Sequence, residues 1–171
     1  SPVGARGRNR TVVQERLPAV ISFIRIDSRL IHGQVIETWL PHLKIQRIVV
    51  ADDASVSDPL VRTAMGLAVP PDVEVVIARI DDLPFKKLEN DGVRTLVLLR
   101  DVDSALRAYE RGLVGPLNLG NVHSGPNRTA VSRTVFLTDT ERARLLAMSR
   151  DGLAVTLQTV PNEPARPLQA A

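Results

Sequence analysis

Four side chains suited to binding or transferring an anion lie within eight residues of this 171-residue chain. Arg25, Asp27, Arg29 and His32 stand between an apolar run, typical of a buried strand, and a segment with helical character. The first backbone N–H groups of a helix have no partner within it, and the helix dipole favours negative charge there. The spacing therefore indicates anion chemistry at His32, which lies where the predicted helix begins.

The same four residues also allow a purely structural interpretation. In it, His32 is a hydrogen-bonded histidine near a helix cap, Arg29 is a solvated loop charge, and Arg25 forms a buried ion pair with Asp27. Short motifs often occur without the associated chemistry, so both interpretations stay open on these residues alone. If the loop binds phosphate, Arg29 is the better ligand of the two arginines, because it lies closer to His32 in the sequence.

Motifs for several other chemistries are absent from the sequence. It contains neither the GxxxxGK[ST] nor the GxGxxG nucleotide-binding pattern, no HExxH metal-binding pattern and no GxSxG hydrolase elbow. It has no cysteine, and its three histidines, His32, His42 and His123, are not at close ligand spacing. We therefore expect no metal and no cofactor. His42 follows Pro41 at the predicted helix end and is expected at the surface.

A second acidic feature, Asp52-Asp53, follows the second predicted strand. An acidic pair at this place is also typical of a phospho-accepting receiver domain. A receiver would in addition have an aspartate at the end of the third strand, where Ala78 and Arg79 stand. We therefore favour a structural role for the pair, as a polar strand end and turn.

Length and composition are those of an ordinary globular domain. The hydrophobic share is 44% and the charged share 24%, and 171 residues suit one domain with a full core. No apolar run approaches the ~20 residues of a membrane span, and no signal-peptide pattern is present, so a cytoplasmic protein is expected.

The net charge of +3 arises in residues 1–20, which hold four arginines and one glutamate. The remaining chain holds 18 of the 22 basic and 18 of the 19 acidic residues, so it is neutral. No basic face with interleaved aromatic residues is evident, and nucleic acid is not expected as a partner.

Predicted strands and helices alternate along the chain. The predicted strands are residues 20–26, 46–51, 73–78, 95–99, 116–120, 131–137 and 153–158. The predicted helices are residues 33–40, 58–69, 81–88, 103–111 and 138–150, with Pro41 ending the first. This alternation predicts a three-layer α/β fold, with a mostly parallel sheet of about seven strands and helices on both faces. The loops after four of these strands should share one rim: Asp27–His32, Asp52–Asp53, Arg100–Asp101 and Gly120–Gly125.

The chain is expected to divide into three parts. Residues 1–18 are rich in arginine, glycine and proline and predict a flexible basic arm or linker. Residues 19–165 form a single domain, and residues 166–171 are a tail. The proline-rich segment from Pro161 onward is expected to be irregular.

The segment Arg25-Ile-Asp-Ser-Arg-Leu-Ile-His-Gly-Gln-Val35 resembles the active-site signature of the mannose/fructose/sorbose-type IIB proteins of the bacterial sugar phosphotransferase system (PTS). The similarity extends over about residues 20–165, including the strand and helix from Leu96 and the closing strand, residues 155–161. The second loop departs from the family pattern: Gly120-Asn-Val-His123 stands where the family usually has Gly-Gly-Met-His. His123 therefore has two open interpretations, facing the site or forming loop hydrogen bonds.

The resemblance implies a phosphotransferase in which His32 carries the phosphoryl group on Nδ1. A neutral imidazole is a nucleophile near pH 7, and the transferred group requires cationic and N–H stabilisation. We expect the phosphate-binding residues to be Arg29, Arg25, Asp27, Gly33 and Gln34, and the cationic and N–H stabilisation to come from the arginines and the helix start at Gly33-Gln34.

The same resemblance implies partners. A IIA phosphodonor protein would load His32, and a sugar bound by the membrane permease IIC/IID would receive the phosphoryl group. The chain would then lie in the cytoplasm, peripherally associated with that permease. An alternative stays open, in which the chain is a regulatory phospho-relay or binding module of an incomplete phosphotransferase system, because both roles need a phosphorylatable His32.

Overall fold

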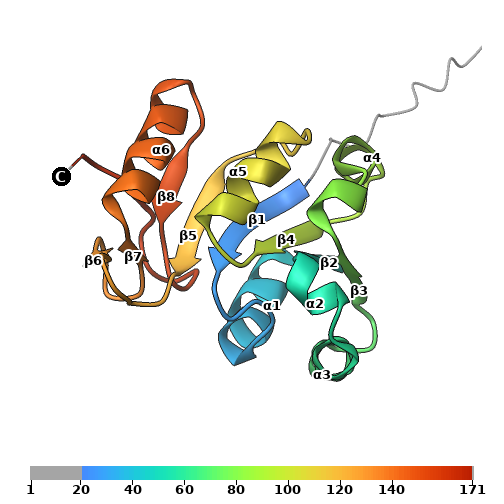
Figure 1. Ribbon diagram of the computed structural model, residues 1–171. Helices are drawn as coiled ribbons and strands as arrows, with labels where there is room; N and C mark the ends of the chain where they lie inside the picture. Colours follow the sequence, from blue (N-terminus) through green and yellow to red (C-terminus); the bar gives the residue numbers. More distant parts are fainter. Residues whose placement is uncertain (1–20, 171) are drawn as a thin grey trace, which may run out of the picture.

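The computed structural model describes residues 21–170, apart from the side chain of Ser22. The arm expected at residues 1–18 lies outside the described residues. The main element is a seven-stranded sheet in the order β3-β2-β4-β1-β5-β8-β9 (Figure 1). All neighbours pair in parallel except β8 and β9. The strands are β1 (Ile21–Asp27), β2 (Arg47–Ala51), β3 (Glu74–Ala78), β4 (Thr95–Leu99), β5 (Leu117–Asn121), β8 (Val155–Leu157) and β9 (Arg166–Pro167).

Helices cover both faces of this sheet, which confirms the expected three-layer α/β fold (Figure 1). One face carries a π-helical segment, η1 (Val35–Trp39), with α1 (Leu40–Leu43) and α3 (Pro59–Ala68). The other carries α4 (Phe85–Asn90), α5 (Val102–Glu110) and α6 (Asp139–Arg150). Two short helices, α2 (Asp53–Val56) and the 3-10 helix η2 (Ile80–Asp82), lie in the loops after β2 and β3.

The core divides into two apolar clusters because side chains alternate across each strand. In β2, Ile48 and Val50 join the cluster beneath α1 and α3, whereas Val49 and Ala51 join the cluster beneath α4, α5 and α6. All four side chains are fully buried. Such continuous burial is what a parallel sheet between two helical layers requires.

The half of the sheet formed by β1, β5 and β8 carries buried polar side chains on one face. On the face shared with α1, its inward side chains include Arg25, Asp27 and Asn118, all of them buried. Their neighbours along the strands, such as Ile26 and Leu117, belong to the opposite apolar cluster. The sheet therefore has a polar region on one face, close to the carboxyl ends of β1 and β5.

Three expectations about elements were wrong. The first helix does not end before Pro41: η1 passes into α1, which contains Pro41 and ends at Leu43. The segment 131–137 is not a strand of the main sheet; it contributes to a small antiparallel pair, β6 (Thr129–Ala130) with β7 (Phe136–Leu137). The segment after Pro161, expected to be irregular, supplies β9 and the buried Leu168.

Helix starts follow the expected chemistry. Asp58 accepts hydrogen bonds from the backbone N–H groups of Leu60 and Val61, and Thr138 with Glu141 forms a complete capping box. None of the helices in the described part of the chain has the length and apolar character needed to cross a membrane.

Candidate functional site

The loop after β1 lies against the end of β5. The connection after β1 runs to one face of the sheet and that after β5 to the other, the arrangement that opens ligand crevices in parallel sheets. The backbone N–H of Ser28 donates to the carbonyl of Asn121 at 2.9 Å, and that of Leu30 to the carbonyl of Asp27 at 2.9 Å. The loop is therefore held as a tight turn against the end of β5.

Leu30 shows that this turn is strained. It is a buried leucine with φ 55°, in the left-handed region that residues with a Cβ rarely adopt. Such a conformation costs about 1 kcal/mol or more. The next residues lead into the helix, where the carbonyl of His32 accepts from the N–H of Ile36 at 3.1 Å. His32 thus lies at the helix start, as the sequence predicts.

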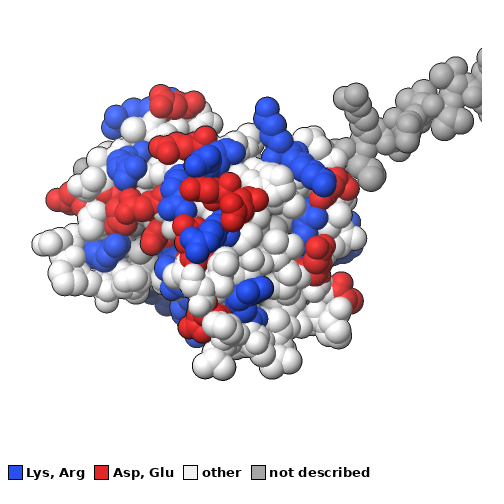
Figure 2. Space-filling model, turned by 45° about the vertical axis from the view of Figure 1, so that its right-hand side comes forward, with Lys and Arg blue, Asp and Glu red and all other residues white. Residues whose placement is uncertain are grey.

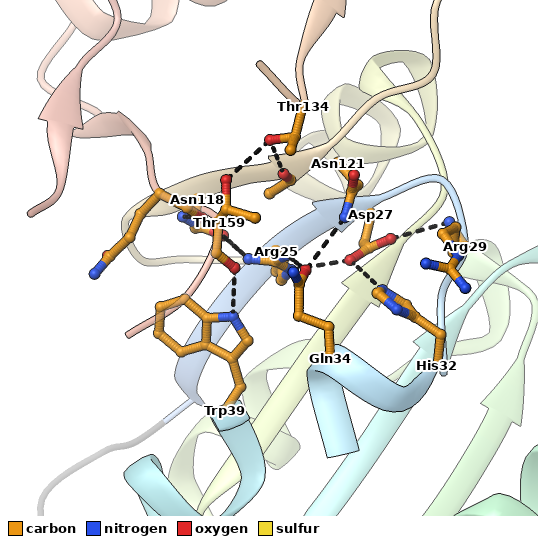
Figure 3. Close-up of polar contacts among 12 residues, drawn as sticks. Arg25, Asp27, Arg29, His32, Gln34, Trp39, Asn118, Asn121, Thr134 and Thr159 are labelled. Carbon is orange, nitrogen blue, oxygen red and sulfur yellow. Dashed lines mark hydrogen bonds and ion pairs between the residues drawn. The ribbon is translucent and has the colours of Figure 1, made fainter. Parts of the chain in front are cut away.

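Asp27 organises the polar side chains around this helix start (Figure 3). Its Oδ2 lies 2.8 Å from Nε2 of His32, and its Oδ1 accepts from the backbone N–H of Arg29 at 3.0 Å. Burial on its own raises the pKa of Asp27, but the hydrogen bond from His32 and the charge of Arg25 hold that pKa below its ordinary value. Asp27 is therefore an ionised carboxylate at neutral pH.

An ionised carboxylate can only accept hydrogen bonds, so Nε2 of His32 carries the proton in this contact. In a neutral imidazole the lone pair then resides on Nδ1. Nδ1 is buried and has no hydrogen-bond partner among the described residues. A buried polar atom without a partner is uncommon and costs about 1–3 kcal/mol, so it is a feature that a function can explain.

Arg25 is the most highly connected side chain of the site. Its Nε donates to Oδ2 of Asp27 at 3.1 Å, and its Nη1 donates to Oδ1 of Asn118 at 2.9 Å and to the carbonyl of Gln158 at 3.1 Å. Its Nη2 donates to Oε1 of Gln34 at 3.2 Å. The side chain is fully buried. Direct phosphate binding by Arg25 is therefore not supported; the structure shows the other interpretation, a buried ion pair with Asp27.

Two further residues shape the space around the Arg25 guanidinium. The indole ring of Trp39 lies 5.4 Å from its Cζ and donates through Nε1 to the carbonyl of Thr159 at 3.0 Å. A Cβ placed on Gly120 would lie 1.9 Å from Cζ of Arg25. Only glycine leaves room for the guanidinium at that position.

The remaining predicted site residues have distinct environments. Arg29 is exposed, and its guanidinium makes no hydrogen bond or ion pair with any described residue. Gly33 is exposed at the helix start. Gln34 is half-buried, and its Oε1 accepts from both Arg25 and Asn121.

Asp27 and Arg25 thus lie beneath His32, whereas Arg29 and Gly33 lie at the surface. The two other histidines, His42 and His123, are both exposed. Within residues 21–170 no three histidine or acidic side chains gather as metal ligands would.

Several residues of the site were missed in the sequence. Asn118, Trp39, Asn121 and Gly120 all contact the Arg25–Asp27–His32 network or its immediate partners. A signal for one of them exists: Asn118 is a polar residue between Leu117 and Leu119 in a buried strand, and such a side chain requires a polar partner inside the protein.

The acidic pair after β2 is structural, as favoured from the sequence. Asp52 caps α2 and accepts two hydrogen bonds from Arg100, at 3.1 and 2.7 Å. Asp53 accepts from Nη2 of Arg107 at 2.6 Å and from the backbone N–H of Ile80 at 3.0 Å. Figure 2 shows acidic and basic side chains interleaved in this manner on the face that it presents.

Acid is expected to destabilise the fold. Although burial raises the pKa of the two most buried members, hydrogen bonds from His32 or from arginine side chains hold the pKa values of four aspartates below the ordinary 3.8: Asp27, Asp52, Asp53 and Asp91. Their stabilising contribution is present above pH 3.8 and is lost as the pH falls below it. Urea unfolding at pH 7, 5, 4 and 3 should show a free energy of unfolding that declines mainly between the last two points. Equal values at pH 7 and pH 3 would contradict these ion pairs.

Comparison with known proteins identifies the family. The sequence-family model described as "PTS system sorbose subfamily IIB component" matches residues 21–171. The chain is 24% identical over 148 residues to the PTS system sorbose-specific EIIB component of Klebsiella pneumoniae, covering 85% of this chain and 90% of that protein. It is equally similar to the mannose-specific EIIAB component of Escherichia coli (strain K12), but covers only 46% of that protein. The chain thus spans about half the length of the EIIAB relatives that it matches.

Solved structures agree with this fold. The structure of manxB from Thermoanaerobacter tengcongensis superimposes with a TM-score of 0.76 at 30% identity, covering 86% of this chain and 91% of that one. The IIBSor domain of the sorbose permease from Klebsiella pneumoniae has the same fold, with a TM-score of 0.76 at 24% identity and 85% and 91% coverage. The resemblance of the Arg25–Val35 segment is thereby confirmed over nearly the whole described chain, and the chain belongs to the sorbose subfamily of PTS IIB components.

Proposed function

We propose that this chain is a phosphohistidine carrier of a sugar phosphotransferase system. His32 accepts a phosphoryl group on Nδ1 from a IIA phosphodonor protein. It then passes the group to a sugar bound by the membrane permease IIC/IID. The observation that carries the proposal is the hydrogen bond from Nε2 of His32 to Asp27, which leaves the Nδ1 lone pair free at a helix start.

The chemistry of the first step suits these residues. Attack by Nδ1 forms a bond to phosphorus while the bond from phosphorus to the donor's histidine nitrogen breaks. The His32 ring gains positive charge in the process, and the Asp27 carboxylate beside Nε2 stabilises that charge without moving. The phosphoryl oxygens meet the exposed Arg29 and the unpaired N–H groups of the helix start.

The burial of Nδ1 adds a requirement. An atom without exposed surface cannot meet the phosphorus of a partner protein, so the His32 ring or the turn before it moves when the donor binds. The turn is suited to this, since it contains the strained Leu30 and the exposed Arg29. The movement would relieve the backbone strain at Leu30 and would give the buried Nδ1 of His32 access to hydrogen-bond partners. Both gains would offset part of its cost.

Replacement of His32 tests the proposal directly. Incubation with a phosphorylated IIA protein of the mannose or sorbose type should label the wild type with acid-labile phosphate, and His32→Ala should stay unlabelled. His42→Ala is the matched control, because His42 is an exposed histidine of the same helical region and should label normally. Equal labelling of wild type and His32→Ala would refute the proposal.

Arg29→Lys is expected to slow transfer with little effect on stability. The planar guanidinium offers two parallel N–H groups to a phosphoryl group, and a compact ammonium reproduces this less well. We expect at least a tenfold slower single-turnover transfer from IIA, equivalent to about 1.4 kcal/mol of transition-state stabilisation. The melting temperature should change by about 1 °C or less, because the side chain is exposed and unpaired among the described residues. An unchanged rate would assign Arg29 to partner docking, and a collapsed melting curve would make it structural.

A further inference from the structure

The side-chain amide of Gln34 is held in one orientation by two donors from different parts of the chain. Nη2 of Arg25 donates to its Oε1 at 3.2 Å, and Nδ2 of Asn121 donates to the same oxygen at 3.3 Å. Both partners can only donate at these atoms, so the oxygen of Gln34 must face them and the amide cannot be flipped. Figure 3 shows Gln34 beside His32, with Arg25 and Asn121 around its amide end.

The NH2 group of Gln34 consequently makes no hydrogen bond with any described residue. None of the hydrogen bonds of the described residues uses Nε2 of Gln34, and this atom is not among the buried polar atoms that lack a partner. It is therefore an accessible, unpaired double donor two residues after His32. Hydrogen-bond donors held in place before the reaction stabilise developing negative charge without reorganising.

We propose that Asn121 is a positioning residue: with Arg25 it fixes the Gln34 amide so that Nε2 donates to the phosphoryl oxygens on His32. The inference rests on the proposed phosphocarrier function. During transfer the bond from phosphorus to the donor nitrogen breaks, the bond to Nδ1 forms, and the three equatorial oxygens keep their negative charge throughout. Gln34 supplies N–H groups to these oxygens, and no proton is transferred.

The backbone of Asn121 strengthens the argument that its side chain has a role at this site. Its carbonyl accepts from the N–H of Ser28 in the His32 loop, and the residue pairs with Asp27 across β1 and β5. The main chain of Asn121 thus contacts Ser28 before His32, and its side chain contacts Gln34 after His32. The second loop, which begins here, is thereby coupled to the orientation of the phosphoryl-binding amide.

A double-mutant cycle separates this role from simple packing. Gln34→Leu is expected to slow single-turnover transfer from phosphorylated IIA by about 100-fold, the lower end of the usual range for loss of a preorganised donor. Asn121→Leu should slow it about 3–10-fold in the wild type, since Arg25 still holds the amide, and should have no further effect in the Gln34→Leu background. Asn90→Leu is the matched control: Asn90 is exposed at the end of α4, and its amide bonds only to the backbone carbonyl of Lys86.

The 31P resonance of phosphorylated His32 gives a readout that packing alone would not move. It should shift in Gln34→Leu, shift in the same direction and by less in Asn121→Leu, and stay unchanged in Asn90→Leu. Equal slowing by Asn121→Leu in both backgrounds, or an unshifted 31P signal in Gln34→Leu, would overturn the inference. Normal labelling of His32 with no effect of either variant would leave the carrier function intact and refute only the role of Gln34 and Asn121.

Discussion

Asp27→Asn is expected to slow phosphoryl transfer to His32 by about 10²–10⁴-fold, at most the loss seen when the carboxylate behind a catalytic histidine becomes an amide. Both carboxylate oxygens of Asp27 accept hydrogen bonds, from His32 and Arg25 on one and from the backbone of Arg29 on the other. An asparagine has only one oxygen. Whichever way the amide turns, an NH2 group faces a donor, and one of the two orientations forces the proton of His32 onto the nucleophilic Nδ1.

The same variant is expected to lose stability. Asp27 and Arg25 form an ion pair in which both side chains are fully buried. Removing one partner of a buried pair leaves an uncompensated charge and costs about 3–5 kcal/mol. For a domain of this size the melting temperature should fall by about 10 °C. The ion pair of Asp27 with Arg25 would therefore link the geometry of the proposed nucleophile, His32, to the stability of the sheet.

Transfer and stability can be measured separately. Single-turnover rates should be taken at a temperature where circular dichroism shows Asp27→Asn to be folded. Asp53→Asn is the matched control, because Asp53 also pairs with an arginine but lies 39% exposed at a different strand end. It should leave the rate within about twofold and the melting temperature within a few degrees, as is usual for exposed pairs. A rate for Asp27→Asn within threefold of the wild type would exclude the proposed role of the carboxylate.

The contiguous part of the site was predictable from the sequence, and the network around it was not. Asp27 and His32 lie five positions apart, so one loop brings them together. By contrast, Arg25 contacts Asn118 and Gln158, which lie 93 and 133 positions away in the sequence. Such contacts depend on which strands become neighbours in the sheet. Here β5 lies next to β1, and β8 lies next to β5, although other strands separate β1 from β5 in the sequence. The buried surroundings of Arg25, which the sequence analysis assigns to phosphate binding, could not be predicted for this reason.

The wrong boundaries have local physical causes. Proline usually ends a helix because it lacks an N–H and its ring crowds the preceding turn. Here the chain is π-helical over Val35–Trp39, with the N–H of Leu40 bonded to the carbonyl of Val35, and the α-helix that follows has Pro41 in its first turn, where no N–H is required. The alternation of residues 131–137 predicts a strand. Only Phe136–Leu137 forms one, since β5 already pairs with β1 and β8 on its two sides.

Gly120→Ala is expected to disrupt the candidate site from outside the loop that carries His32. The added methyl group would lie 1.9 Å from Cζ of Arg25, so the guanidinium must move. The Trp39 ring, whose centroid lies 5.4 Å from Cζ, limits the directions in which the guanidinium can move. Displacement breaks its contacts with Asn118 and the carbonyl of Gln158, and we expect a loss of about 3 kcal/mol of unfolding free energy.

Transfer to His32 should also fall in Gly120→Ala, by at least about tenfold, because small displacements of positioned groups are costly for reaction rates. The effect reaches His32 through Arg25 and Asp27, so it should be absent in an Arg25→Met background, where the clash with the guanidinium no longer exists. Gly125→Ala is the matched control: a Cβ there meets only the Arg128 side chain, at 3.6 Å, an ordinary contact. If Gly120→Ala slows transfer equally with and without Arg25, the methyl group acts on the loop directly, and the positioning of Asp27 by Arg25 is refuted.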